Sequence, residues 1–191
     1  MAGLIILALG VGLWVVAHMF KRLAPAQRAA LTRAMGEGSK GIFALLIVAS
    51  IVLMVIGYQR AELIWLWFPQ VWFGHLNNLL VLVAFYVYGI GMARGVLSTK
   101  VRHPQLWGTF IWAAAHLLVK GHLAGLILFG GLAVWALAAI AAINAQDGGW
   151  SPKPAKGGWM RDLVAVPIVL VVYAIVGAIH TWLGVNPFGG L

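Results

Sequence analysis

The sequence predicts an all-α protein, a polytopic transmembrane helical bundle of about six spans with both termini outside the cytoplasm. Two observations predict this fold class. Hydrophobic residues make up 63% of the 191 residues and charged residues only 9%, with a mean hydropathy of +0.97. Ordinary soluble domains are roughly half apolar and a quarter charged. The apolar residues also fall into long runs that are separated by basic residues, which is the pattern of repeated membrane crossing.

Six apolar runs are candidate spans, because about 20 apolar residues cross the roughly 30 Å hydrocarbon core of a bilayer. No basic residue precedes the first run, and Lys21 and Arg22 follow it, so we expect a retained span and not a cleaved signal peptide. The length suits one integral membrane domain over residues 1–191 that is joined by short loops. The predicted spans are residues 3–20, 41–58, 76–92, 104–119, 123–143 and 163–183.

Two segments depart from regular spans. The run 104–119 has 16 residues, or about 24 Å of helix, so we expect neighbouring helices to shield it or the bilayer to thin around it. Residues 64–73 contain three tryptophans and Pro69. Tryptophan rings settle at headgroup depth and proline interrupts helices, so this stretch predicts an interfacial segment.

The basic residues predict the orientation. If the six spans alternate, only Arg60 and Lys120 lie on one side of the membrane. The excess marks the cytoplasmic side, which places both termini outside. Despite a net charge of +9, this distribution predicts contacts with membrane lipid and no nucleic-acid partner. The eleven basic residues on the cytoplasmic side are Lys21, Arg22, Arg28, Arg33, Lys40, Arg94, Lys100, Arg102, Lys153, Lys156 and Arg161.

The composition excludes several kinds of chemistry. The chain has no cysteine, which excludes disulfides, thiolate metal sites and a cysteine nucleophile. Its acidic residues, which lie in loops or at span ends, are Glu37, Glu62, Asp147 and Asp162. A carboxylate proton relay within the membrane and catalysis by paired carboxylates are therefore disfavoured.

Histidine is the remaining side chain that can ligate a metal or exchange protons near neutrality. His18 and His116 each follow a strongly apolar segment, where a polar ring needs a partner. Metal ligation and interhelical hydrogen bonding remain alternatives for both. We expect His75 and His122 to be solvated loop residues and His180 to be a hydrogen-bonded packing residue.

One block of the chain resembles a known family. It runs from Arg102-His103-Pro104-Gln105-Leu106-Trp107-Gly108 through Trp112-Ala113-Ala114-Ala115-His116-Leu117-Leu118 to Leu128-Phe129-Gly130-Gly131. These residues closely resemble the NnrU family of bacterial membrane proteins, and the resemblance extends over nearly the whole chain. The zeta-carotene isomerase of plants and cyanobacteria is similar at a greater distance. The resemblance implies a place in the bacterial inner (cytoplasmic) membrane.

The resemblance also implies a cofactor. The isomerase is a haem b enzyme whose two ligating histidines correspond by motif to His18 and His116, with His103 matching the Arg-His-Pro histidine. The isomerase has a cysteine three residues before its second ligand, where this chain has Ala113. Ligand exchange at that position is therefore excluded. Family members commonly carry Asn-Gly-Asp at the turn that here reads Lys120-Gly121-His122.

A haem would also need cations for its propionates, and Arg22, Arg94 and Arg102 on the cytoplasmic rim are the candidates. The depth of the residues in the membrane favours a different ligand. His116 lies twelve residues after Pro104, about 18 Å from the cytoplasmic end of its helix if the helix stands upright. His18 lies near the cytoplasmic end of its own span. His103 lies nearer the depth of His18. We expect His18 with His116 from the resemblance and keep His103 as the alternative.

Three function classes follow. The NnrU resemblance implies a b-type haem protein serving nitrite and nitric oxide respiration in denitrification, as electron carrier, sensor or assembly factor for a reductase system. The alternatives are a haem-dependent cis-trans isomerase of a carotenoid-like polyene and a haem-free accessory membrane protein. The alanine at position 113 lowers the isomerase alternative.

Overall fold

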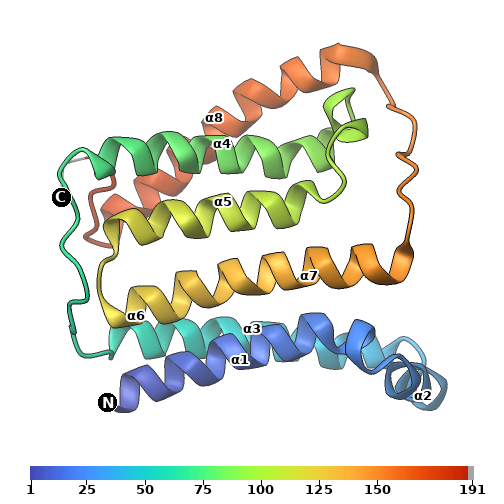
Figure 1. The fold of residues 1–191 in the computed structure, drawn as a ribbon, viewed down its shortest axis with the longest axis horizontal. Coiled ribbons are helices and arrows are strands. Elements are labelled where there is room, and N and C mark those ends of the chain that lie inside the picture. The colour runs from blue at the N-terminus through green and yellow to red at the C-terminus, as the bar shows by residue number, and fades with distance from the viewer. Residues whose placement is uncertain (189–191) are drawn as a thin grey trace. The chain divides into compact units, whose positions relative to one another are not determined.

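The computed structural model describes residues 1–188 (Figure 1). In that range the regular elements are helices, together with an isolated backbone bridge between Trp65 and His122. The chain divides into two compact units. Unit 1 comprises Met1–Leu66 and His122–Gly131, and unit 2 comprises Trp67–Gly121 and the chain from Leu132 onward. Each unit is described by itself.

The predicted all-α bundle of about six spans is confirmed. Five helical stretches within residues 1–188 are long and apolar enough to cross a membrane. The remaining predicted span forms α5 (Pro104–Val119), whose 16 residues begin and end where the sequence predicts. The five long stretches are α1 (Ala2–Leu23), α3 (Gly38–Gln59), α4 (Phe73–Ala93), the continuous stretch Leu123–Asp147 and α8 (Gly158–Trp182).

Three local features were not predicted. The stretch Leu123–Asp147 consists of α6 (Leu123–Gly125), the π-helical turn η2 (Leu126–Gly130) and α7 (Gly131–Asp147). Between α1 and α3 the chain forms a further short helix, α2 (Pro25–Met35), which buries no residue. Proline at its first position has the backbone angle that a helix start requires. Between α4 and α5 lies a short 3-10 turn, η1 (Leu97–Thr99).

In unit 1, α1 and α3 lie side by side and antiparallel (Figure 1). Glycines bring the two backbones together: a Cβ on Gly10 would lie 2.7 Å from the backbone nitrogen of Met54, and one on Gly57 would lie 2.6 Å from Leu7 Cα. Small residues allow such close approach between membrane helices. The core that forms around this contact contains Leu4, Leu7, Val11, Met54 and Ala124.

The close packing of α1 and α3 predicts how two glycine-to-alanine substitutions change the stability of the protein. Gly57→Ala should destabilise the protein by about 1–3 kcal/mol, because the added methyl meets backbone atoms that cannot rotate away. Gly12→Ala is the matched control on α1, since a Cβ there meets nothing within 4 Å, and it should be neutral or stabilise the helix by up to about 1 kcal/mol. Thermal unfolding in mild detergent measures both. Equal melting temperatures for the two variants would contradict the close contact.

In unit 2, α4 packs against both α5 and α8 (Figure 1). Gly108 of α5 lets the helices approach, because a Cβ there would lie 2.9 Å from the carbonyl oxygen of Ala84. On the other side, the Tyr173 hydroxyl of α8 donates to the carbonyl of Asn78 at 3.2 Å. The short α5 is therefore covered along one face by the longer α4.

One acidic residue is more enclosed than its place at a span end suggests. Helix α8 begins at Gly158, so Asp162 lies within its first turns, and only 3% of the residue is exposed. Its Oδ2 accepts a hydrogen bond from the backbone N–H of Leu97 at 3.2 Å, and its carboxylate contacts Gly95. Asp162 thereby anchors the α4–α5 connection to the start of α8.

Candidate functional site

His18 is held by the turn of helix that precedes it. It lies in α1, five residues before the helix ends at Leu23. Its Nδ1 is 2.9 Å from the carbonyl oxygen of Trp14, and its ring lies over the Trp14 indole with a centroid distance of 4.0 Å. One tryptophan four residues earlier therefore both hydrogen-bonds and packs against the imidazole.

His116 has the same local arrangement on another helix. It lies in the last turn of α5. Its Nδ1 is 2.8 Å from the carbonyl oxygen of Trp112, and the two ring centroids are 5.0 Å apart. The sequence Trp-x-x-x-His thus gives the same local arrangement of tryptophan and histidine in α1 and in α5. The reason is that residues four apart in a helix lie one above the other on the same face.

These hydrogen bonds determine the tautomer of both rings. A carbonyl oxygen can only accept, so Nδ1 of His18 and of His116 carries the proton. The lone pair of a neutral imidazole then lies on Nε2. Metal-ligating histidines are oriented in this way, with one ring nitrogen donating to a carbonyl and the other binding the metal.

His103, the alternative ligand, is held differently. It is the residue before α5, and its Nε2 is 2.9 Å from the side-chain oxygen of Asn144 in α7. Because that oxygen accepts, Nε2 of His103 is a donor in this arrangement. Ligation through Nε2 would require this bond to break and the ring to change tautomer.

His122 differs from the predicted solvated loop residue. Its Nδ1 accepts a hydrogen bond from the backbone N–H of Gly125 at 3.1 Å, which caps the start of α6. Its Nε2 lies 3.3 Å from the Tyr58 hydroxyl, and the Trp65 indole contacts the ring edge-on. The imidazole is half-buried. The cap on α6 therefore occupies Nδ1 of His122, and the contact with Tyr58 occupies Nε2.

Of the other two histidines, His180 has the hydrogen bond predicted for it, whereas His75 is exposed as predicted but lies in a helix and not in a loop. His75 is exposed in the first turn of α4. His180 is half-buried near the end of α8, and its Nδ1 is 2.8 Å from the carbonyl oxygen of Val176. Its hydrogen bond resembles those of His18 and His116, but no tryptophan lies four residues before it.

The predicted site residues are divided between the two units. His18 and Arg22 lie in α1 of unit 1, whereas His103, His116, Arg94 and Arg102 lie in unit 2. Arg94 is exposed and ends α4 with a left-handed backbone, φ +55° and ψ +36°. Arg102 lies just before α5. The pairing of His18 with His116 and the roles of the three arginines remain predictions.

The donor set limits what could be bound. Among residues 1–188, no group of three or more histidine, aspartate or glutamate side chains lies together as a metal site. A metal held by one or two of these histidines would need most of its ligands from another molecule. A porphyrin could provide them, because it supplies four nitrogen ligands. The apolar segments around His18 and His116 also suit an apolar macrocycle.

The two tryptophans were missed as site residues in the sequence. The signal was present, because Trp14 and Trp112 each precede a candidate histidine by four residues. Their contribution became apparent only with the backbone, since the hydrogen bonds use carbonyl oxygens and not the indoles.

Comparison with known proteins places the chain in a family. The sequence model described as NnrU protein matches residues 6–187, which is nearly the whole chain. No curated protein and no solved structure matches it. The matched range contains His18, the Arg-His-Pro segment at residues 102–104 and His116. The chain therefore belongs to the NnrU family of membrane proteins.

Proposed function

We propose that this membrane protein binds haem b through His18 and His116 and carries electrons in nitrite or nitric oxide respiration. The observation that supports the proposal best is the repeated Trp-x-x-x-His arrangement. In both copies Nδ1 donates to a carbonyl oxygen, and metal-ligating histidines are commonly oriented by such a bond.

The residues present fit such a cofactor. Neutral imidazoles from two helices are common axial ligands in helical haem proteins, and the surrounding residues are apolar. Arg22, Arg94 and Arg102 are proposed partners for the propionates, which pair well with guanidinium groups. When bound, haem supplies one-electron chemistry at iron. The protein supplies the ligands, the apolar surroundings and the cationic rim.

The ligand set also favours one role over the others. If both His18 and His116 held the haem, electron transfer would be favoured over direct binding of nitric oxide by a sensor. The isomerase alternative finds less support, because Ala113 stands where the isomerase has a thiol, and Ala113 is completely buried in the packing of α5. A nitrite or nitric oxide reductase system is accordingly the proposed electron partner.

The visible absorption spectrum tests the proposal. Protein made with adequate haem supply and purified in mild detergent should show a Soret band, and its pyridine complex should have the spectrum of a b-type haem. Reduction should sharpen the visible bands, and nitric oxide should change them slowly because both axial positions are occupied. Protein without a Soret band under these conditions would exclude the haem proposal and leave the haem-free accessory role.

A further inference from the structure

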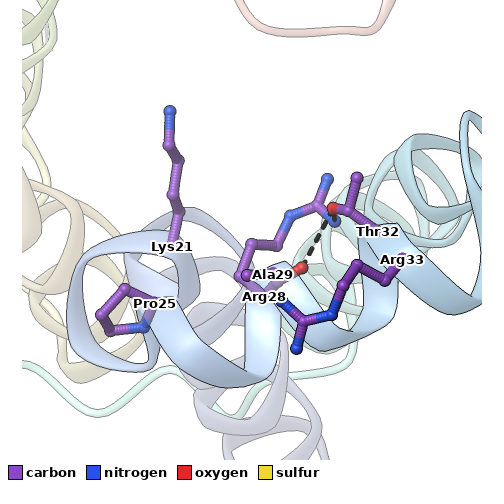
Figure 2. A pocket seen from close by; sticks show the side chains of 6 residues that line it. All are labelled: Lys21, Pro25, Arg28, Ala29, Thr32 and Arg33. Carbon is purple, nitrogen blue, oxygen red and sulfur yellow. Dashed lines mark hydrogen bonds between the residues drawn. The ribbon is translucent and has the colours of Figure 1, made fainter.

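A basic hollow lies on unit 1, and no histidine lines it. It has a volume of about 520 Å³ and is formed by the end of α1 and one face of α2 (Figure 2). No acidic residue lines it. The lining residues are Lys21, Pro25, Arg28, Ala29, Thr32 and Arg33, and this group is called the basic hollow below.

Arg28 is held in place within the hollow. Its Nη1 donates to the Thr32 hydroxyl at 2.9 Å and to the Ser39 hydroxyl at 3.0 Å, and its guanidinium lies 4.7 Å from the centre of the Phe43 ring. Ser39 is 1% exposed and donates to the Gly36 carbonyl at 2.8 Å. A buried hydroxyl and an aromatic face therefore orient this guanidinium, which lowers the entropy that a bound anion would cost.

The charged groups of Lys21 and Arg33, the other two basic residues of the hollow, are available to a ligand. Lys21 and Arg33 form no ion pair or hydrogen bond through their side chains with any described residue. The nearest acidic residue along the chain, Glu37, pairs with Lys40 at 2.7 Å outside the hollow. Three basic side chains thus line one open volume, and no carboxylate lines it. Such an arrangement favours a phosphate group, which guanidinium binds with two parallel hydrogen bonds.

The surroundings indicate a lipid as the source of that phosphate. The hollow begins at the last turn of α1, a helix long and apolar enough to span a membrane. Two large apolar side chains are exposed at the two ends of α2: Leu23, which ends α1, at 71%, and Met35, the last residue of α2, at 47%. Apolar side chains beside a basic cluster at the end of a span match a phospholipid, whose headgroup and acyl chains lie next to each other.

From this arrangement we infer that the basic hollow binds the phosphodiester headgroup of an anionic phospholipid, with Arg28 as the oriented contact. The site is separate from the candidate haem ligands. A lipid bound there would hold α2 against the membrane surface at the end of α1.

Native mass spectrometry of the full-length protein, titrated with dioleoyl phosphatidylglycerol or dioleoyl phosphatidylcholine, tests the inference. Wild type should bind phosphatidylglycerol at least about tenfold more tightly, because both lipids carry a phosphodiester but the choline cation of phosphatidylcholine would be repelled by the basic side chains of the hollow. Lys21→Gln/Arg33→Gln should lose this preference, and because neither side chain packs against the fold, the variant should keep its thermal stability. Arg28→Lys, which keeps the charge but not the fork of donors, should weaken binding as well.

The matched control is Lys153→Gln/Lys156→Gln, which removes two exposed charges from the loop between α7 and α8 and should leave binding within about twofold of wild type. Equal losses in the two double variants would overturn the site and indicate general attraction between charges. Displacement of phosphatidylglycerol by millimolar inorganic phosphate, with equal binding of the free anion, would overturn the lipid as the ligand. The absorption spectrum should be unchanged in every variant.

Discussion

His18→Ala and His116→Ala should each abolish the haem absorption of the purified protein. Each substitution would remove one of the two proposed haem ligands, and the remaining histidine would hold the group less tightly in these apolar surroundings. His75→Ala should leave the absorption unchanged, because His75 is exposed in the first turn of α4. The Soret absorbance per protein, after expression with adequate haem supply, measures the effect.

Two further controls separate ligation from folding. His122→Ala should retain haem but lower stability by about 1 kcal/mol, because it removes the cap on Gly125 and the contact with Tyr58. His18→Gln and His116→Gln keep a polar side chain that can hydrogen-bond between helices. If the glutamine variants are as stable as wild type but bind no haem, the result supports His18 and His116 as haem ligands. Haem binding in both glutamine variants would contradict that assignment.

The alternative ligand gives a different pattern. If haem survives His116→Ala but is lost in His103→Ala, the resemblance assigns the second ligand wrongly, and the bond from His103 to Asn144 must break on binding. If wild type shows no Soret band and His18→Ala is as stable as wild type, the haem proposal fails. Interhelical hydrogen bonding by His18 would then also contribute little.

A single cysteine at Gln70 should react with an impermeant maleimide applied from outside the cytoplasmic membrane, and one at Ser151 should react only after that membrane is permeabilised. The chain has no cysteine of its own, so each variant carries one thiol. Both positions are exposed and lie outside helices. The basic residues place the loop with Gln70 outside the cytoplasm and the loop with Ser151 inside.

The same experiment tests whether α5 crosses the membrane. The path from Gln70 to Ser151 passes through α4, α5 and the stretch Leu123–Asp147. Three crossings place the two cysteines on opposite sides, whereas two crossings place them on the same side. Labelling of both thiols from outside would therefore show that the 16 residues of α5 do not span. Labelling of Ser151→Cys alone would reverse the predicted orientation.

The long helices could be predicted from the sequence because a helix that lies in lipid needs a long run of apolar residues. A span must be apolar for about 20 residues and must satisfy its backbone internally, so span positions were predictable to within a few residues. The boundaries of α5 matched because Pro104 marks a helix start. Helix α2 was missed because its 11 residues are too few to cross a membrane and bury no side chain.

The sequence by itself determined the membrane class, the approximate spans, the family and the histidines that could act. Only the tertiary structure decided which groups from distant parts of the chain meet His103 and His122, namely Asn144 and Tyr58. The tautomer of His18 depends on a carbonyl one helical turn away, whereas that of His122 depends on the backbone N–H of Gly125, which donates to Nδ1 and so places the ring proton on Nε2 beside Tyr58. The burial of Asp162 against Gly95 likewise depends on how α8 meets the α4–α5 connection. Hydropathy describes each residue alone, whereas hydrogen bonds and burial require the position of a second group.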